Sequence, residues 1–162
     1  MTHILIICTA NICRSPMAEG ILKKKIQENP HFQDWQVSSA GTWGRDDLPA
    51  APEAIEVLER HGIDISTHTS RIVTPEIIQA ADLILTMENG HREALVVEFP
   101  EKRQQIRLIT ELVGASYDIE DPMGSPIGEF EKLAHEFDRM FDKMLLTMEK
   151  RVDQRSEKKE TG

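Results

Sequence analysis

Eight residues near the N-terminus, CTANICRS at positions 8–15, combine side-chain types that can bind phosphate and react with it. Cys8 opens this segment, and Arg14 lies six positions later. An ionised thiol is a strong nucleophile, and a planar guanidinium can hold two oxygens of one phosphate group. We therefore expect Cys8 to attack a phosphate group that Arg14 binds, and Arg14 to stabilise the charge of the transition state.

The segment lies between a predicted strand and a predicted helix. The run HILIIC at His3–Cys8 is apolar and β-branched, and apolar residues recur at helical spacing over Met17–Ile26. A turn that leads into a helix directs backbone N–H groups into one concavity, at the positive end of the helix dipole. Such a turn binds an anion without a metal ion and favours a thiolate at Cys8. The residues expected to line this substrate site are Thr9, Ala10, Asn11, Ile12, Cys13 and Ser15.

Two residues of this loop have more specific expected roles. Ser15 can donate a hydrogen bond to the thiolate of Cys8 and help it to leave in a second reaction step. Asn11 suits a sharp bend, because asparagine tolerates left-handed backbone geometry. The alternative is that Cys8 is only a buried core residue. That alternative does not explain why a polar loop and Arg14 follow it.

Strands and helices alternate along the rest of the chain. Further strands are predicted at residues 35–39, 82–86 and 105–109, and further helices at residues 53–61 and 89–97. Gly62 ends the first of these helices, and Thr74-Pro75 begins a short helical turn. The alternation predicts an α/β fold with a parallel sheet that helices cover on both faces. Ligands of such sheets bind beyond the carboxyl ends of the strands, where Cys8 lies.

Two other stretches bear on the site and the core. The Gly- and Pro-rich loop at residues 40–51 is long for a compact domain, which makes it a candidate for lining a site. From Pro126 to about Arg151, apolar residues recur at three- and four-residue steps, so we expect a helix that packs on the sheet rather than a peptide-binding groove. Residues 153–162 are polar, and we expect them to form a frayed tail after a single domain over residues 1–152.

The composition disfavours several classes of protein. A net charge of -9 makes nucleic acid an unlikely partner. No apolar run approaches the roughly 20 residues of a membrane span, and the N-terminus lacks an export cleavage pattern. We therefore expect no membrane association and a mature N-terminus. Two cysteines are too few for a disulfide-stapled scaffold or a four-thiolate zinc site. The expectation is a cytoplasmic protein that uses no metal ion and no other cofactor.

Several motifs together resemble the low-molecular-weight protein tyrosine phosphatase family. They are ILIICTANICRSPMAEGIL at 4–22, VSSAGTW at 37–43, HGIDISTHTSR at 61–71, ADLILTME at 81–88 and EDPMG at 120–124, in the family's order and approximate spacing. The resemblance implies a four-stranded parallel sheet with helices on both faces and a phosphate-binding loop after the first strand. It also implies hydrolysis of phosphotyrosine in a protein substrate through a cysteinyl-phosphate intermediate, with inorganic phosphate as product.

Such a reaction needs a general acid that protonates the leaving oxygen and later activates water. The candidate is Asp121, which precedes Pro122 in the loop EDPMGSP at 120–126. Aspartate before proline is also a common turn former, and the residues alone do not decide between the two roles. By the resemblance, Asp121 matches the family's general acid. Asp118 and Glu120 are weaker candidates, because neither precedes a proline.

The resemblance also implies supporting residues. Ser39 and His68 match family positions that hydrogen-bond the strained loop asparagine, which is Asn11 here. Their expected role is structural support of the loop. Arg71 matches a family position too, but the resemblance gives it no clear role, and a surface salt bridge remains an alternative.

The rim of the expected pocket departs from the eukaryotic pattern. From their placement in the long loop and after the Asp-Pro pair, Trp43 and Met123 are expected to wall the pocket above the phosphate. Eukaryotic members carry two tyrosines after Asp-Pro, whereas this sequence has Met123 and Gly124, and Tyr117 does not replace them. We therefore expect no regulation by phosphorylation at this spot, and a closer likeness to bacterial members.

Cys13 has two possible roles. It lies five residues from Cys8 in the same loop, close enough in a curled turn to form a disulfide under oxidation. Such a bond would protect Cys8 from over-oxidation and predicts reversible inactivation by peroxide. The alternative is a residue that only packs the loop, and the sequence does not separate the two.

Three other functions compete with phosphotyrosine hydrolysis. Arginine phosphatases carry threonine at the position that matches Ile12, so Ile12 favours phosphotyrosine but leaves this alternative open. Arsenate reductases of related architecture use two further cysteines downstream, and none follows Cys13; an external thiol would have to replace them. A module that only binds phosphoprotein would not need Cys8 and Asp121 in addition to Arg14.

Overall fold

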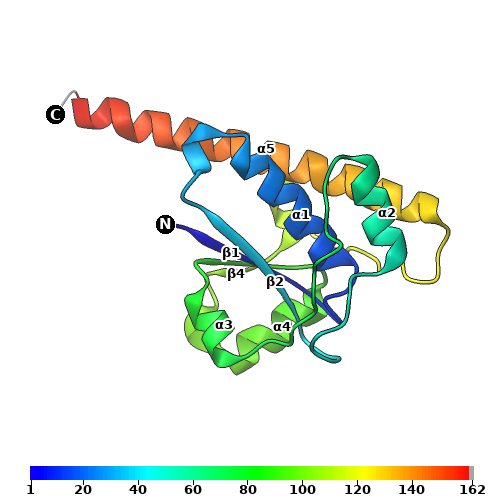
Figure 1. The fold of residues 1–162 in the computed structure, drawn as a ribbon. Coiled ribbons are helices and arrows are strands. Elements are labelled where there is room, and N and C mark those ends of the chain that lie inside the picture. Colours follow the sequence, from blue (N-terminus) through cyan, green and yellow to red (C-terminus); the bar gives the residue numbers. More distant parts are fainter. Residues whose placement is uncertain (161–162) are drawn as a thin grey trace.

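A central sheet of four parallel strands organises the computed structural model, which describes residues 1–160 (Figure 1). In spatial order the strands are β2 (Gln36–Gly41), β1 (His3–Cys8), β3 (Leu83–Thr86) and β4 (Ile106–Leu108). All three pairings between neighbouring strands are parallel. The predicted α/β fold with a four-stranded parallel sheet is confirmed.

Both faces of the central strand β1 are buried. Ile4 and Ile6 belong to one apolar cluster, whereas Leu5 and Ile7 belong to a second one. Successive side chains of a strand point to opposite faces of the sheet, so the two clusters lie on opposite sides. This explains why β1 is a continuous apolar run rather than an alternation of apolar and polar residues.

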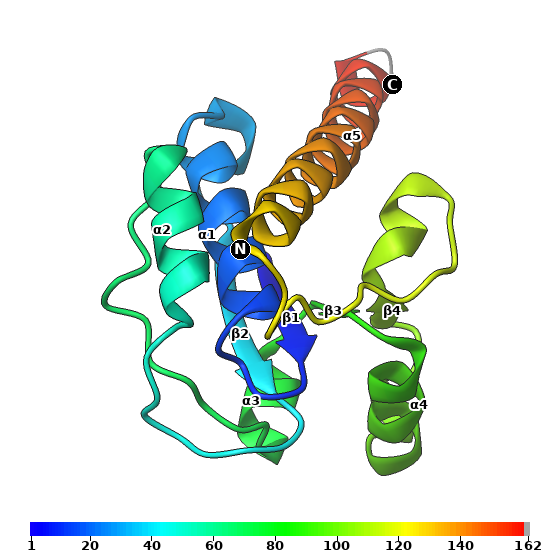
Figure 2. The ribbon, with the colours of Figure 1, turned by 90° about the vertical axis from the view of Figure 1, so that its right-hand side faces the viewer.

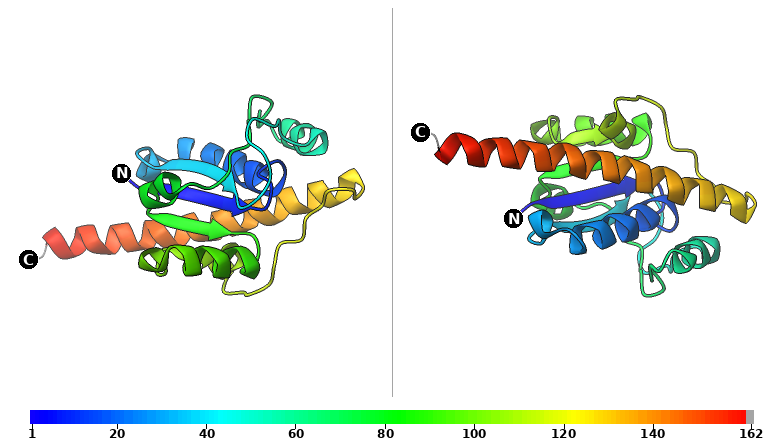
Figure 3. Two further views of the ribbon diagram at one scale, coloured as in Figure 1. Left: turned by 90° about the horizontal axis from the view of Figure 1, so that it is seen from below. Right: turned by 90° about the horizontal axis from the view of Figure 1, so that it is seen from above.

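Helices form a layer on each face of the sheet (Figures 2 and 3). One layer contains α1 (Arg14–Gln27), α2 (Pro52–Arg60) and α5 (Ile127–Glu160), and the other contains α3 (Pro75–Ala80) and α4 (Asn89–Glu98). Short 3-10 helices are η1 (Pro30–Phe32), η2 (Pro100–Lys102) and η3 (Ile109–Val113). The expected helices on both faces are thus present.

The chain changes direction across the sheet at β1. It passes from β1 to β2 on one side, and then crosses to β3 on the other side. At such a switch point the connections leave the carboxyl ends of neighbouring strands in opposite directions and open a crevice between them. Cys8 is the last residue of β1 and therefore lies at the mouth of this crevice.

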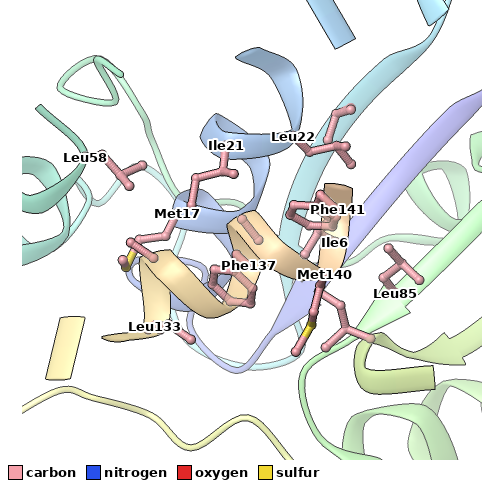
Figure 4. Close-up of a cluster of buried hydrophobic side chains, with 14 of the residues drawn as sticks. Ile6, Met17, Ile21, Leu22, Leu58, Leu85, Leu133, Phe137, Met140 and Phe141 are labelled. Atoms are coloured by element: carbon pink, nitrogen blue, oxygen red, sulfur yellow. The ribbon is translucent and has the colours of Figure 1, made fainter. Parts of the chain in front are cut away.

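The apolar stripe of α5 completes the core on one face of the sheet, where the helix packs mainly against α1, α2 and η3. Its buried members are Phe130, Leu133, Phe137, Met140, Phe141, Met144 and Leu145. Figure 4 shows how this stripe meets Met17 and Leu22 of α1 and Ile6 of β1 in one cluster. The expected packing of this helix on the sheet is confirmed, and the methionines serve as core residues.

The end of α5 differs from the prediction. The helix continues to Glu160, beyond the end near Arg151 that the apolar stripe indicates. The added turns consist mainly of Lys, Glu, Arg and Gln, which are good helix formers even without an apolar partner. Residues 153–160 are thus helical rather than a frayed chain, and residues 161–162 lie outside the described residues. Among the described helices, none is long and apolar enough to cross a membrane.

Candidate active site

The loop from Cys8 to Cys13 turns sharply at Asn11, whose φ of 58° lies in the left-handed region. Three contacts hold the fully buried Asn11 side chain in this conformation. Its Nδ2 donates to Ser15 Oγ at 2.8 Å and to Ser39 Oγ at 2.9 Å, and its Oδ1 accepts from the backbone N–H of Arg71 at 3.0 Å. The expected left-handed asparagine is present, and these contacts compensate for its backbone strain.

Surrounding segments bind the outward-facing carbonyls of this loop. Cys8 O accepts a hydrogen bond from Thr42 N at 3.0 Å, and Thr9 O accepts one from Trp43 N at 3.0 Å. Ile12 O accepts one from Ala51 N at 2.7 Å. The carbonyl of Asn11 contacts His68 Nε2 at 2.8 Å. Because the N–H and C=O groups of a trans peptide point in opposite directions, outward carbonyls leave the amides directed towards the centre of the loop.

Cys8 lies at the base of this ring of amides. Its Sγ is 3.0 Å from Ser15 Oγ and accepts a hydrogen bond from the Asn11 backbone N–H at 3.3 Å. The side chain is buried, and α1 begins at Arg14, with its N-terminus towards the loop. Donors and a helix N-terminus that face a sulfur stabilise its thiolate form.

Gly41 makes the close approach of β2 to the loop possible. A Cβ atom at this position would lie 2.5 Å from Thr9 O and 3.0 Å from the carbonyl carbon of Ala10. Both are backbone atoms, so neither can move aside without a shift of the loop. The glycine of the motif VSSAGTW is therefore a packing requirement of the phosphate loop, which the sequence reasoning did not identify.

Arg14 is buried, and both terminal nitrogens of its guanidinium are hydrogen-bonded. Nη1 donates to Glu88 Oε2 at 2.8 Å and to Ile119 O at 2.7 Å, and Nη2 donates to Thr9 Oγ1 at 3.3 Å. Within residues 1–160 these bonds use both Nη1 hydrogens and one Nη2 hydrogen. Within the described residues Nε makes no hydrogen bond, and an Nε–H together with an Nη2–H can bind two oxygens of a phosphate group.

Glu88 and His91 are contacts of this site that the sequence reasoning missed. Glu88 follows β3 at the same edge of the sheet as Cys8. This position after a parallel strand was the one sequence feature that could have identified Glu88 as a site residue. His91 Nε2 lies 2.9 Å from Thr9 Oγ1, and its Nδ1 accepts from the backbone N–H of Glu88 at 3.2 Å. Burial lowers the pKa of His91, and the charge of Arg14 acts in the same direction, against the opposing effect of Glu88.

The Asp-Pro loop is attached to the phosphate loop through Ile119. Its N–H donates to Met87 O at 2.8 Å, and its carbonyl accepts from Arg14. Asp121, two residues further on, is exposed, and its Oδ1 accepts from Met123 N at 3.0 Å. The pKa of the Cys13 thiol is raised, first by burial and then by the charge of Asp121. The structure thus brings this carboxylate within electrostatic range of the loop.

The other acidic candidates are placed differently. Asp118 Oδ1 accepts from the backbone N–H of Asn89 at 2.7 Å, at the start of α4. Glu120 is exposed. Their carboxylates therefore give no reason to prefer them to Asp121.

The expected supporting residues surround Asn11. Ser39 and His68 make the two hydrogen bonds described above, and Ser39 Oγ also donates to Glu19. Arg71, whose role the sequence left open, binds the loop through its backbone N–H, and its Nε donates to Ser39 O at 2.9 Å. Arg71 thus supports the loop through hydrogen bonds to Asn11 and Ser39. Among the described residues, it forms no surface salt bridge.

The two expected wall residues are exposed on segments next to the loop. Trp43 is 76% exposed and Met123 is 43% exposed. The backbone N–H of Trp43 donates to Thr9 O of the phosphate loop. Both side chains are accessible to a bound substrate, and their role as pocket walls stays a prediction.

Comparison with known proteins agrees with this geometry. A family model described as low molecular weight phosphotyrosine protein phosphatase matches residues 3–157. The chain is 34% identical over 139 residues to the probable low molecular weight protein-tyrosine-phosphatase EpsP of Ralstonia nicotianae, covering 86% of this chain and 90% of the relative. It is also 34% identical over 143 residues to a protein-arginine-phosphatase of Geobacillus stearothermophilus, covering 88% of this chain and 93% of the relative.

A solved structure shares the whole architecture. The low molecular weight protein tyrosine phosphatase from T. tengcongensis superposes with a TM-score of 0.85 at 40% sequence identity, covering 91% of this chain and 99% of that chain. The fold, the phosphate loop and the sequence thus match one family over nearly the full length of the chain. The chain belongs to the low molecular weight phosphotyrosine protein phosphatase family.

Proposed function

We propose that this protein hydrolyses phosphotyrosine in protein substrates through a cysteinyl-phosphate intermediate. Cys8 is the nucleophile, Arg14 binds the phosphate and the transition state, and Asp121 is the general acid and base. The observation that carries the proposal is the position of Cys8 Sγ, which contacts the Asn11 amide and the Ser15 hydroxyl at the base of the loop. Membership of the phosphatase family supports it.

In the first step the thiolate of Cys8 attacks phosphorus, and the bond from phosphorus to the tyrosine oxygen breaks. The loop amides and the guanidinium of Arg14 bind the phosphoryl oxygens as the charge spreads over them. Asp121 protonates the leaving phenolate, which departs as tyrosine. The exposed position of this carboxylate near the loop lets it reach a bulky substrate.

In the second step water attacks the cysteinyl phosphate. Asp121, now ionised, takes a proton from the water, and the phosphorus–sulfur bond breaks. The Ser15 hydroxyl, 3.0 Å from Cys8 Sγ, stabilises the departing thiolate. Inorganic phosphate leaves, and the enzyme returns to its starting state.

The chemistry needs no metal ion or cofactor, because the amides, the helix N-terminus and Arg14 supply the positive potential. We further propose that the protein acts in the cytoplasm. The two cysteines, Cys8 and Cys13, are both free thiols, which suits a reducing compartment. The proposed partner is a tyrosine-phosphorylated protein, and neither nucleic acid nor a membrane is required.

Phosphoarginine is the second candidate substrate, because one of the relatives is a protein-arginine-phosphatase. The discriminating position is Ile12, half-buried in the loop, with its carbonyl bound to Ala51. An isoleucine lacks the hydroxyl that a threonine would direct at the reacting group, so its apolar side chain favours the flat ring of phosphotyrosine.

The test compares three phosphopeptides with the same flanking sequence, carrying phosphotyrosine, phosphoserine or phosphoarginine, in the presence of a chelator. The wild type is expected to have the highest kcat/KM on phosphotyrosine, and Cys8→Ser to have no turnover. The variant Ile12→Thr is expected to shift the ratio towards phosphoarginine. Turnover by Cys8→Ser, or loss of activity with the chelator, contradicts the mechanism. A higher kcat/KM of the wild type on phosphoarginine would make phosphoarginine, and not phosphotyrosine, the substrate.

A further inference from the structure

Helix α2 packs against α5 (Figure 1). Two histidines and a glutamate meet at the C-terminal end of α2. His61 caps the C-terminus of α2, and Glu131 and His135 lie on α5. One ligand atom from each residue falls within 4.8 Å of the others. None of these side chains takes part in the contacts of the phosphate loop, so the cluster has no role in the proposed reaction.

The backbone holds the three side chains together. Glu131 and His135 are four residues apart on one helix, a spacing that places both on the same face. His61 is fixed by its N–H to Leu58 O at 3.0 Å, and its carbonyl accepts from Lys24 Nζ at 3.1 Å. The cluster therefore results from the packing of three helices, α1, α2 and α5, rather than from one mobile segment.

The donor atoms converge on one carboxylate oxygen. Glu131 Oε2 is 2.8 Å from His61 Nε2 and 4.0 Å from His135 Nε2. The other oxygen, Oε1, accepts from Arg60 at 3.3 Å. A carboxylate whose second oxygen is held by a guanidinium can offer the first oxygen to a cation in a fixed direction.

The chemistry of these donors selects a class of metal. Two imidazoles and a monodentate carboxylate suit Zn²⁺ and similar transition metals, whereas Mg²⁺ and Ca²⁺ prefer oxygen ligands alone. Arg60 is a nearby like charge for a cation, but its Nη2 is paired with Glu56 at 2.8 Å.

The surroundings leave room for a further ligand. His61 and His135, but not Glu131, line a cavity of about 320 Å³ beside the cluster. His135 is 65% exposed and can rotate towards the shared oxygen. Three protein ligands with access to solvent match zinc sites that complete their tetrahedron with water.

We propose that His61, Glu131 and His135 form a Zn²⁺ site that joins the C-terminus of α2 to α5. The metal replaces the direct contact between His61 and Glu131, and a water molecule is the fourth ligand. Because both helices contribute ligands, bound Zn²⁺ stabilises the folded protein relative to the unfolded chain.

The test is a calorimetric titration of Zn²⁺ into the Cys8→Ser variant, which removes the active-site thiolate as a competing ligand. One Zn²⁺ per chain is expected. The variants His135→Ala and His61→Ala, made in the Cys8→Ser background, are expected to bind Zn²⁺ at least about tenfold more weakly than Cys8→Ser alone. His31→Ala, which removes an exposed imidazole on η1, is the matched control and is expected to bind as the parent does.

A second readout is the thermal unfolding midpoint. With Zn²⁺ at about 100 times its dissociation constant, the Cys8→Ser protein is expected to unfold about 5 to 10 °C higher, and His135→Ala to lose that shift. Because His135 is largely exposed, its replacement leaves the metal-free midpoint unchanged. Equal Zn²⁺ affinity in the parent and in both histidine variants, or no binding to Cys8→Ser, overturns the proposal.

Discussion

Glu88 binds Arg14 through a 2.8 Å ion pair that no spacing in the sequence indicates. The guanidinium is 3% exposed, and a buried charge needs a partner. Glu88 meets this need at Nη1, and Nε, which has no hydrogen-bond partner in the described residues, remains available for the proposed phosphate contact. The pair therefore orients Arg14 before the substrate arrives, so little of the binding energy is spent on ordering this side chain.

The orienting role of Glu88 predicts the effect of Glu88→Gln. This change keeps the shape of the side chain but removes its charge, so the guanidinium loses its strongest restraint. We expect kcat/KM on a phosphotyrosine peptide to fall by about 10- to 100-fold. Steady-state kinetics measures this, with Glu98→Gln at the exposed end of α4 as control. Unchanged kinetics in Glu88→Gln would show that the ion pair does not orient Arg14.

Replacing Gly41 by alanine is expected to disrupt the phosphate loop. The new Cβ would lie 2.5 Å from Thr9 O, and the backbone must shift to admit it. We expect a loss of about 1 to 3 kcal/mol in the free energy of unfolding, together with a loss of activity. Chemical denaturation is the measurement. Gly128→Ala, where a Cβ meets no atom within 4 Å, is expected to change stability by at most about 1 kcal/mol.

The proposed role of Asp121 is tested by Asp121→Asn with two leaving groups. An amide cannot donate a proton to phenolate, so kcat for phenyl phosphate is expected to fall by about 10²- to 10⁴-fold. The loss should be smaller for 4-nitrophenyl phosphate, whose leaving group needs less protonation. Glu120→Gln is the control. Equal losses with both substrates would assign Asp121 a structural role.

Cys13 is expected to protect Cys8 from peroxide. Its raised pKa keeps it a thiol, so peroxide oxidises Cys8 to a sulfenic acid. The Cys13 thiol then condenses with it to a disulfide and releases water. After peroxide and then dithiothreitol, the wild type should recover its activity and Cys13→Ser should not. Full recovery of Cys13→Ser would remove this role.

Stability is expected to depend on the protonation of His91. Its pKa is lowered in the folded state by burial, with Arg14 acting in the same direction and Glu88 and Asp118 opposing. The unfolded chain therefore binds the proton first as the pH falls. The contribution of neutral His91 is complete above pH about 6.5 and is lost as the pH falls towards the folded-state pKa.

Urea unfolding between pH about 5 and 7.5 measures this dependence, since that range spans the ordinary titration of histidine. His91→Gln is expected to lose less stability than the wild type on acidification, because the group that must be protonated is gone. His31→Ala is the control, and its profile should follow the wild type. Parallel profiles for the wild type and His91→Gln would contradict the assignment.

Local patterns in the sequence determined the strand, loop and helix that carry Cys8. The run HILIIC is apolar throughout because both faces of β1 are buried, and the helical spacing after Pro16 predicts α1. Periodicity also identified α5, because its stripe faces the core. It misplaced the end of α5, since the polar residues beyond Arg151 remain helical through propensity rather than through burial.

The sequence by itself therefore indicated the chemistry of the proposed site, because the proposed nucleophile Cys8, the donors of its loop and Arg14 are neighbours in the chain. Only the tertiary structure decided how they are held. Glu88 reaches Arg14 because β1 and β3 pair side by side, and Arg71 reaches Asn11 because its segment crosses the end of β2. Such contacts depend on the distance between strands in space, which residue spacing along one chain does not encode.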